Sequence, residues 1–311
     1  MKYLIFFLFL FWKSAPAQLQ ILSDSERIRL FDYYISPLSH DSMKGRATAT
    51  VGMLHSAHFI ANAFKNIGLH PASFNDEDYF QYFYLKEKFL GINVAGVLEG
   101  SSLKDEIIVI SAHYDHIGMS DNLIDSVYNG ANDNASGTAM MLYLALELKK
   151  INPKRTILFI AFSGEELGLL GSKHFVSKIT LPQQFKAVLN FDMVGRGYEC
   201  FITGSAFSNL QKLLNKELEI NNKPIFGRRF FKDDRDTYKS YFERSDNYPF
   251  AKLKIPAHTF MCTEDFDGYY HTVGDEKSTL NFKLMSKVAE ALIIAIQPLV
   301  NGEMTPTRLK Y

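Results

Sequence analysis

Residues 106–116 read EIIVISAHYDH, and this stretch indicates both the type of fold and the place where chemistry is expected. Its β-branched and apolar residues predict a buried strand over 106–112. His113 then stands at the carboxyl end of that strand, with Asp115 two residues further on. Because ligands in open α/β sheets bind beyond the carboxyl ends of the strands, we expect His113 to face a binding site.

Outward from this stretch, short β-rich runs alternate with helical stretches from residue 92 onward. The alternation predicts an α/β fold in which a mixed, mostly parallel sheet carries helices on both faces. Gly68 is placed to end the first helix, and Pro153 follows the second. The other predicted strands are residues 93–98, 156–162, 186–191, 200–203 and 258–263, and the predicted helices are residues 52–67, 137–150, 167–177, 208–218 and 282–296.

The first 17 residues have the features of a signal peptide. Lys2 precedes an apolar run over residues 3–12, and an Ala-x-Ala arrangement ends at Ala17. A membrane anchor is the alternative, but it needs about 20 apolar residues and this run has about half that number. We therefore expect an exported protein that begins at Gln18, with residues 18–311 forming one domain because no linker or repeat divides them.

The composition excludes several classes of protein. The 34 basic residues balance the 34 acidic ones, which argues against a nucleic-acid binder held by phosphate neutralisation. The two cysteines, Cys200 and Cys262, are too few for a cysteine-ligated zinc site. An oxidising compartment would permit a disulfide between them, but both stand in predicted strands, and we expect free thiols in the core. Any bound metal is therefore expected to have histidine and carboxylate ligands.

The other predicted strands also end in acids or histidines. Glu165 and Glu166 follow the strand at 156–162, and Asp192 follows the strand at 186–191. Asp133 lies in a loop of small residues before a helix, and Tyr270 and His271 follow the last strand. Helix capping explains any one of these acids, but it does not explain five such positions at one edge of the sheet.

Charge favours metal ions at this edge. Three carboxylates, those of Asp133, Glu166 and Asp192, are costly to hold together away from water unless cations neutralise them. We expect two Zn²⁺ ions bridged by Asp133, one with His113 and Asp192 and the other with Glu166 and His271. Each ion then has three protein ligands and an open position, as in catalytic zinc sites, and the histidines argue against Ca²⁺ or Mg²⁺.

Five motifs in this chain resemble those of metallopeptidase family 28, the co-catalytic di-zinc aminopeptidases. They are HYDH at 113–116, GANDNASG at 130–137, GEELGLLGS at 164–172, NFDMVG at 190–195 and YHTVGD at 270–275. The resemblance extends over about residues 40–295 and includes MKGR at 43–46 and SDNYPF at 245–250, where Asn247 replaces a histidine of many members.

The resemblance assigns roles to individual positions. It makes His113, Asp133, Glu166, Asp192 and His271 the metal ligands and Glu165 the general base. It implies that Asp115 orients His113 and that Tyr270 stabilises the tetrahedral intermediate. We expect three other histidines, His116, His174 and His258, to be ordinary residues, although His116 stands next to the site.

These observations predict an exported zinc aminopeptidase that acts on peptides with a free N-terminus and has no membrane anchor. One alternative is glutaminyl cyclase, a one-zinc acyl-transfer enzyme of the same fold. A carboxypeptidase-type relative is another, for which Arg228, Arg229 and Arg235 offer carboxylate-binding groups in an irregular segment, residues 221–247, that we expect to be a surface loop. A non-catalytic binding module is disfavoured by the presence of Glu165.

Overall fold

The computed structural model describes residues 21–72, 78–85, 87, 89–121, 125–221, 230–233, 241–263 and 267–311. It is built around one mixed sheet in the order β1-β3-β5-β4-β6-β9-β7-β8, with β2 paired to β3. The strands are β1 (His70–Pro71), β2 (Phe80–Leu85), β3 (Phe89–Leu98), β4 (Leu103–His113), β5 (Arg155–Phe162), β6 (Phe185–Phe191), β7 (Cys200–Ile202), β8 (Phe231–Asp233) and β9 (Ala257–Met261).

Parallel strands form the centre of this sheet. Strands β5, β4, β6 and β9 are parallel neighbours, and β3 and β7 flank them in antiparallel pairing. The predicted α/β fold with a mixed sheet is confirmed, although the antiparallel pairs on both sides make the sheet less parallel than expected. The four central strands all end at one edge, which brings their following loops together.

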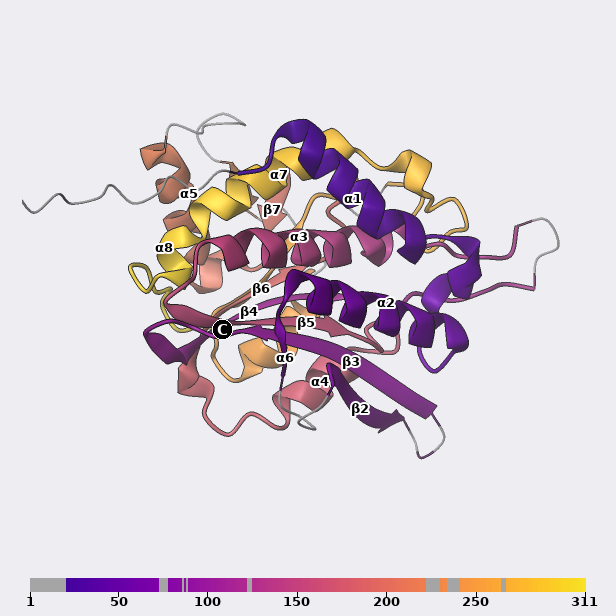
Figure 1. The fold of residues 1–311 in the computed structure, drawn as a ribbon, viewed down its shortest axis with the longest axis horizontal. Coiled ribbons are helices and arrows are strands. Elements are labelled where there is room, and N and C mark those ends of the chain that lie inside the picture. Colours follow the sequence, from indigo (N-terminus) through magenta and orange to yellow (C-terminus); the bar gives the residue numbers. More distant parts are fainter. Residues whose placement is uncertain are drawn as a thin grey trace, which may run out of the picture.

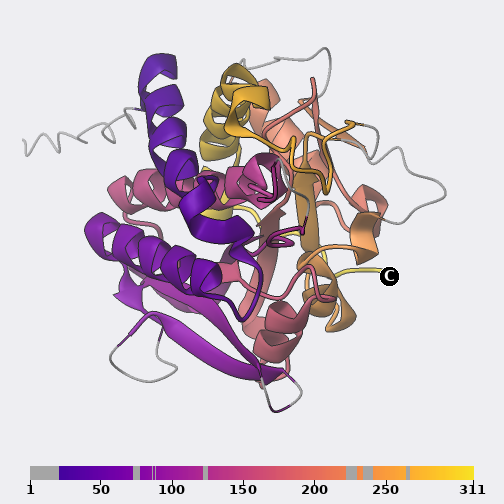
Figure 2. The same ribbon diagram turned by 90° about the vertical axis from the view of Figure 1, so that its right-hand side faces the viewer.

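Helices cover both faces of the sheet (Figures 1 and 2). Helices α1, α2, α3 and α7 lie on one face, and α4 and α6 lie on the other. The helices are α1 (Asp24–Leu38), α2 (Val51–Ile67), α3 (Gly137–Lys150), α4 (Leu170–Val176), α5 (Leu210–Ile220), α6 (Asn247–Lys252), α7 (Phe282–Ala295) and α8 (Gln297–Val300).

Each face of the sheet has its own apolar core. The larger core packs Phe64, Tyr143 and Leu292 of the upper helices against the sheet, and all three side chains are buried. The smaller core centres on Phe162, Phe175 and Phe250, whose rings contact one another below the sheet. This packing fixes helix α3 and strand β4, from which loops of the carboxyl edge extend.

The ends of the helices follow from local sequence. Thr50 caps α2 by accepting a hydrogen bond from Met53 N, and Gly68 ends it in the left-handed conformation, as predicted. Helix α1 was not predicted from the sequence, although Ser23 and Glu26 form a capping box at its start.

Two predicted elements differ from the structure. Helix α4 begins at Leu170 rather than at residue 167, because Gly168 and Leu169 adopt positive φ angles that helical backbone excludes. The segment 221–247 contains a strand, β8, where a surface loop was expected. Phe231 of β8 is buried in the larger core, and the charged residues around it conceal this strand in the sequence.

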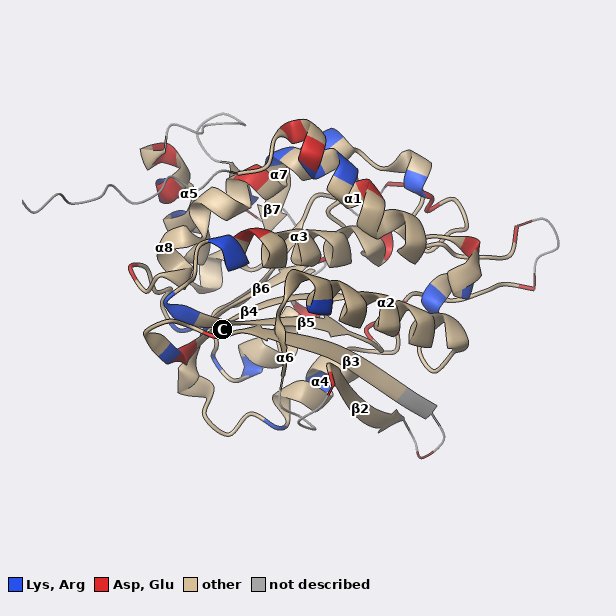
Figure 3. Ribbon diagram, viewed as in Figure 1, with Lys and Arg blue, Asp and Glu red and all other residues tan. Residues whose placement is uncertain are grey.

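Within the described residues, no helix is both long enough and apolar enough to cross a lipid bilayer. Lysine and arginine are interspersed with aspartate and glutamate over the helices that Figure 3 shows. This mixing accords with the absence of net charge in the sequence.

Candidate metal centre

The carboxyl edge of the sheet gathers all the predicted site residues. His113 ends β4, Glu165 and Glu166 follow β5, and Asp192 follows β6. His271 comes from the loop after β9, and Asp133 from the loop that leads into α3. Residues from five separate segments of the chain therefore meet at one place, as the strand-end pattern predicted.

One group of donor atoms consists of His113, Asp133 and Asp192. The Nε2 atom of His113 lies 3.3 Å from Asp133 Oδ1 and 3.4 Å from Asp192 Oδ1. The other carboxylate oxygen of Asp192 accepts a hydrogen bond from the Ser245 hydroxyl at 2.7 Å. All three members of the group are buried.

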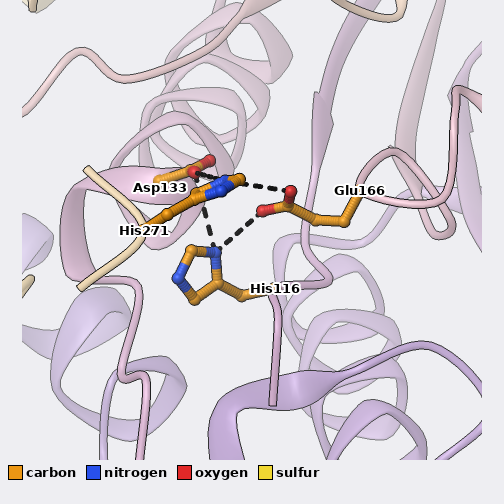
Figure 4. A group of neighbouring side chains, drawn as sticks. All are labelled: His116, Asp133, Glu166 and His271. Carbon is orange, nitrogen blue, oxygen red and sulfur yellow. Dashed lines mark hydrogen bonds and ion pairs between the residues drawn. The ribbon is translucent and has the colours of Figure 1, made fainter. Parts of the chain in front are cut away.

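A second group consists of His116, Asp133, Glu166 and His271 (Figure 4). His271 Nε2 lies 3.2 Å from Asp133 Oδ2 and 3.0 Å from Glu166 Oε2. Asp133 thus turns one oxygen to each group, which is the arrangement expected of a bridging ligand. His116, which the sequence analysis left as an ordinary histidine, is the one unexpected member.

The donor atoms fit a divalent metal ion. Ligand atoms around a tetrahedral zinc lie about 3.3 Å apart when each is about 2.0–2.1 Å from the metal. The separations in both groups are close to this spacing. His271 Nε2 is moreover buried without a hydrogen-bond partner among the described residues, although two carboxylates face it. Such an orphaned nitrogen is satisfied by a metal ion.

Charge in the centre shows the same need for cations. Burial alone would lower the pKa of His113, but the carboxylates of Glu165 and Asp192 outweigh burial and raise it well above its ordinary value. Burial also opposes the positive form of His271, yet its contacts with Asp133 and Glu166 raise its pKa to about 10. Without metal, protons on these imidazoles therefore do the neutralising that metal ions would do.

The backbone of the Asp133 loop is held by a buried carboxylate, Asp275. Its Oδ1 accepts a hydrogen bond from Asn132 N at 2.9 Å, and its Oδ2 accepts one from Asp133 N at 3.0 Å. Arg196 neutralises this carboxylate through an ion pair of 2.6 Å. Asp275 is the last residue of the YHTVGD motif, and the structure shows that it positions Asp133.

Arg46 fixes the loop that carries His116. Its buried guanidinium donates hydrogen bonds to the carbonyl oxygens of Tyr114, Asn129 and Gly130. Burial lowers the pKa of Arg46 to about 10, which still leaves it charged at neutral pH. It thus joins the segment after β4 to the segment before Asp133.

The contact between Asp115 and His113 differs from the one expected. Nδ1 of His113 lies 3.2 Å from the backbone carbonyl of Asp115 and 3.8 Å from its carboxylate. A carbonyl can only accept, so Nδ1 carries the proton and Nε2 is directed to Asp133 and Asp192. The Asp115 carboxylate instead accepts hydrogen bonds from Thr48 Oγ1 and Glu165 N.

Glu165 lines a pocket together with His113, Asp133, Asp192 and Tyr270. Burial raises the pKa of Glu165 well above its ordinary value, and the carboxylates of Asp192, Asp246 and Glu166 add to the increase. Burial likewise raises the pKa of Tyr270. The apolar part of the pocket wall is formed by Met193, Tyr241 and Met261.

Other predicted residues lie away from the centre or outside the described residues. His258 is buried between Ser208 and Thr203, and His174 stacks on Phe83, so both have structural surroundings. Cys200 and Cys262 are free and buried, as expected. Residues 1–17 and the arginines of the carboxypeptidase alternative, Arg228, Arg229 and Arg235, lie outside the described residues.

Solved structures with this fold include enzymes of two kinds. The zinc aminopeptidase BSAP from Bacillus subtilis superposes with a TM-score of 0.71 and 18% identity, covering 92% of this chain and 97% of that one. Glutaminyl cyclase from Porphyromonas gingivalis superposes with a TM-score of 0.70 and 15% identity, covering 89% and 99%. At these identities the likeness shows the fold and does not separate the two activities.

Comparison of sequences gives more information about the family than comparison of folds. Aminopeptidase YwaD from Bacillus subtilis (strain 168) is 28% identical over 229 residues, which cover 70% of this chain and 47% of that protein. Leupeptin-inactivating enzyme 1 from Streptomyces exfoliatus is 26% identical over 229 residues, covering 60% and 46%. The chain thus spans about half the length of these relatives. The sequence model of peptidase family M28 matches residues 93–296, more than half of the 311 residues, and the chain therefore belongs to peptidase family M28.

Proposed function

We propose that this protein is a zinc aminopeptidase that removes single residues from the free N-terminus of peptides. The observation that carries the proposal is the pair of donor groups that share Asp133 beside the carboxylate of Glu165. A complete pair of groups favours two zinc ions, one held by His113, Asp133 and Asp192 and the other by Asp133, Glu166 and His271. When bound, zinc supplies a Lewis acid for the scissile carbonyl and lowers the pKa of water.

Glu165 is the general base in this proposal. Its carboxylate lines the pocket, whereas the carboxylate of Glu166 points to His116 and His271. Glu165 is therefore free of the donor groups and able to take a proton from the attacking water and pass it to the leaving amine. Asp115 supports this role by accepting a hydrogen bond from Glu165 N. The Tyr270 hydroxyl, on the same wall, is assigned to the oxyanion that develops on the substrate.

The pocket suits a peptide that begins with an apolar residue. Carboxylate oxygens of Asp133, Glu165 and Asp192 that a bound metal leaves unoccupied would accept hydrogen bonds from the free α-amino group of the substrate. The side chain of the first residue is expected to lie against Met193, Tyr241 and Met261. Leucyl and phenylalanyl substrates are therefore expected to be better than aspartyl or lysyl ones.

Initial rates on matched peptides test this function. Zinc-loaded protein should release the first residue from unblocked leucyl and phenylalanyl peptides, whereas the same peptides with an N-acetyl group should resist cleavage. Conversion of N-terminal glutamine to pyroglutamate, without cleavage of unblocked peptides, would establish the cyclase alternative. Cleavage of blocked peptides from the carboxyl end would establish a carboxypeptidase.

Export is part of the proposal and depends on residues 1–17 alone. The basic residue, the short apolar run and the Ala-x-Ala sequence stand in the order that signal peptidase requires. N-terminal sequencing of the mature protein should find Gln18, free or as pyroglutamate. A chain that keeps Met1 in a membrane fraction would contradict export without affecting the catalytic proposal.

A further inference from the structure

His116 occupies a fixed position beside the second donor group. It follows β4 by three residues, and its side chain is fully buried. Its ring packs on Gly130, where a Cβ atom would lie 2.7 Å from the ring carbons. Gly130 also begins the loop that carries Asp133, so the fold holds the imidazole and the bridging carboxylate next to each other.

Nδ1 of His116 contacts the same two carboxylates as Nε2 of His271. It lies 2.9 Å from Glu166 Oε1 and 3.6 Å from Asp133 Oδ2. The corresponding distances from His271 Nε2 are 3.0 Å to Glu166 Oε2 and 3.2 Å to Asp133 Oδ2. Figure 4 shows the ring of His271 above that of His116, each joined by a dashed line to a different oxygen of Glu166. Both nitrogens thus face the same two carboxylates, although His116 is the more buried and its Nδ1 lies farther from Asp133, and a metal ion bound by one lies within reach of the other.

The two ring nitrogens of His116 have different surroundings. Its Nε2 atom is buried and makes no hydrogen bond within the described part of the chain. The polar contacts of this ring are therefore all at Nδ1, on the side of the donor group. A buried imidazole that leaves one nitrogen without a partner is costly, so the contacts at Nδ1 must compensate for that cost.

We propose that His116 is a metal ligand, which completes a four-residue site with Asp133, Glu166 and His271. The inference rests on the zinc content proposed above and adds a ligand to it. The two sites then differ, because one has four protein ligands with two imidazoles and the other has three with one. Four ligands complete a tetrahedral zinc site, whereas three leave an open position. The His116 site should accordingly fill first and release zinc last, and the open position should lie on the His113 side.

X-ray absorption spectroscopy of the zinc-loaded wild-type protein tests this proposal without a variant. Imidazole rings give a distinct outer-shell signal, so they can be counted per metal. With two equivalents of zinc, three ligating histidines give about 1.5 imidazoles per zinc, and with one equivalent the filled site should show about two. An average near 1.0 at two equivalents would overturn the proposal. Absence of zinc binding would instead overturn the proposed function as well.

A variant separates a ligand from a hydrogen-bond partner. Asparagine at position 116 can still donate to Glu166 but is a poor zinc ligand. Loss of an outer-shell partner weakens metal binding by about 10- to 100-fold, so His116→Asn should weaken the tighter equivalent by more than about 100-fold in a chelator competition. His55→Asn, at an exposed position on α2, is the matched control and should leave both affinities unchanged. A loss of about 100-fold or less in His116→Asn would be that of an outer-shell partner and would contradict ligation.

Discussion

Two adjacent carboxylates in this protein have different surroundings. Glu166 faces His116 and His271, whereas Glu165 faces the pocket and has its pKa raised by burial and by neighbouring acids. We predict that Glu165→Gln lowers kcat by at least about 100-fold, because the general base is lost, while the zinc content stays the same. Glu166→Gln, the matched variant, should lose zinc. Rates and metal analysis on both proteins check the assignment, and the opposite pattern would reverse it.

His258 predicts how stability depends on pH. Its Nδ1 donates to the carbonyl of Thr203 at 2.8 Å, and its Nε2 accepts from the Ser208 hydroxyl at 2.7 Å, so the neutral ring is fully satisfied. Burial lowers the pKa of His258 to about 4. The unfolded chain binds this proton near its ordinary pKa of about 6.5, so the free energy of unfolding should fall as pH drops from 6.5 towards 4, by about 3 kcal/mol in total.

Urea unfolding of metal-free protein at several pH values measures this effect. Chelation removes the contribution of zinc, and His258→Asn serves as the comparison. The variant should be less stable than the wild type at pH 7, and the difference should shrink as the pH falls towards 4. If the difference in the free energy of unfolding between the two proteins does not change with pH, the pKa of His258 is not lowered in the folded protein.

At the scale of elements, the loop over residues 131–136 depends on a distant carboxylate. Asp275 accepts hydrogen bonds from Asn132 N and Asp133 N and pairs with Arg196, all in a buried position. Asp275→Ala leaves two backbone N–H groups and a guanidinium without their partner. We predict a loss of about 3–5 kcal/mol in the free energy of unfolding and weaker zinc binding, because the bridging ligand is displaced. Asp32→Ala, which removes an exposed partner of Lys277, should cost less than about 1 kcal/mol.

The sequence was most informative where a site residue directly follows a strand. His113, Glu165, Glu166 and Asp192 all stand within a few residues of a strand end, so the direction of the parallel strands placed them together. The strand-end pattern did not predict contacts between segments that are distant in the sequence. His116 also stands three residues after a strand end, but only its contact with Glu166 shows that it belongs to the centre, and Asp275 accepts a hydrogen bond from the Asp133 backbone 142 residues away in the sequence. No local spacing encodes such contacts.

Some helix boundaries could be predicted from the sequence and others could not. Gly68 ends α2 as predicted, because a left-handed cap depends only on local backbone. Helix α4 begins later than expected, because the turn through Gly168 and Leu169 is part of the segment that delivers both glutamates. The apolar residues of the turn resemble a helical pattern in the sequence, but the positive φ angles of Gly168 and Leu169 keep their backbone out of the helix.

At the scale of the whole molecule, one sheet edge collects ligands for two donor groups that share Asp133. The fold itself accommodates aminopeptidases and a cyclase with nearly equal TM-scores, 0.71 and 0.70. The activity therefore depends on the contents of that edge rather than on the architecture. Asp192 and His113 are the informative residues, because they serve only the three-ligand group.

The zinc content of the purified protein tests this account most directly. Metal analysis of the wild type after removal of loosely bound zinc should give about two Zn²⁺ per chain. Asp192→Ala should reduce the content towards one and lose most of the activity, because the donor group with the open position is broken. A wild-type protein that saturates at one zinc per chain, with Asp192→Ala unchanged in its zinc content, would contradict the two-metal centre and the aminopeptidase mechanism built on it.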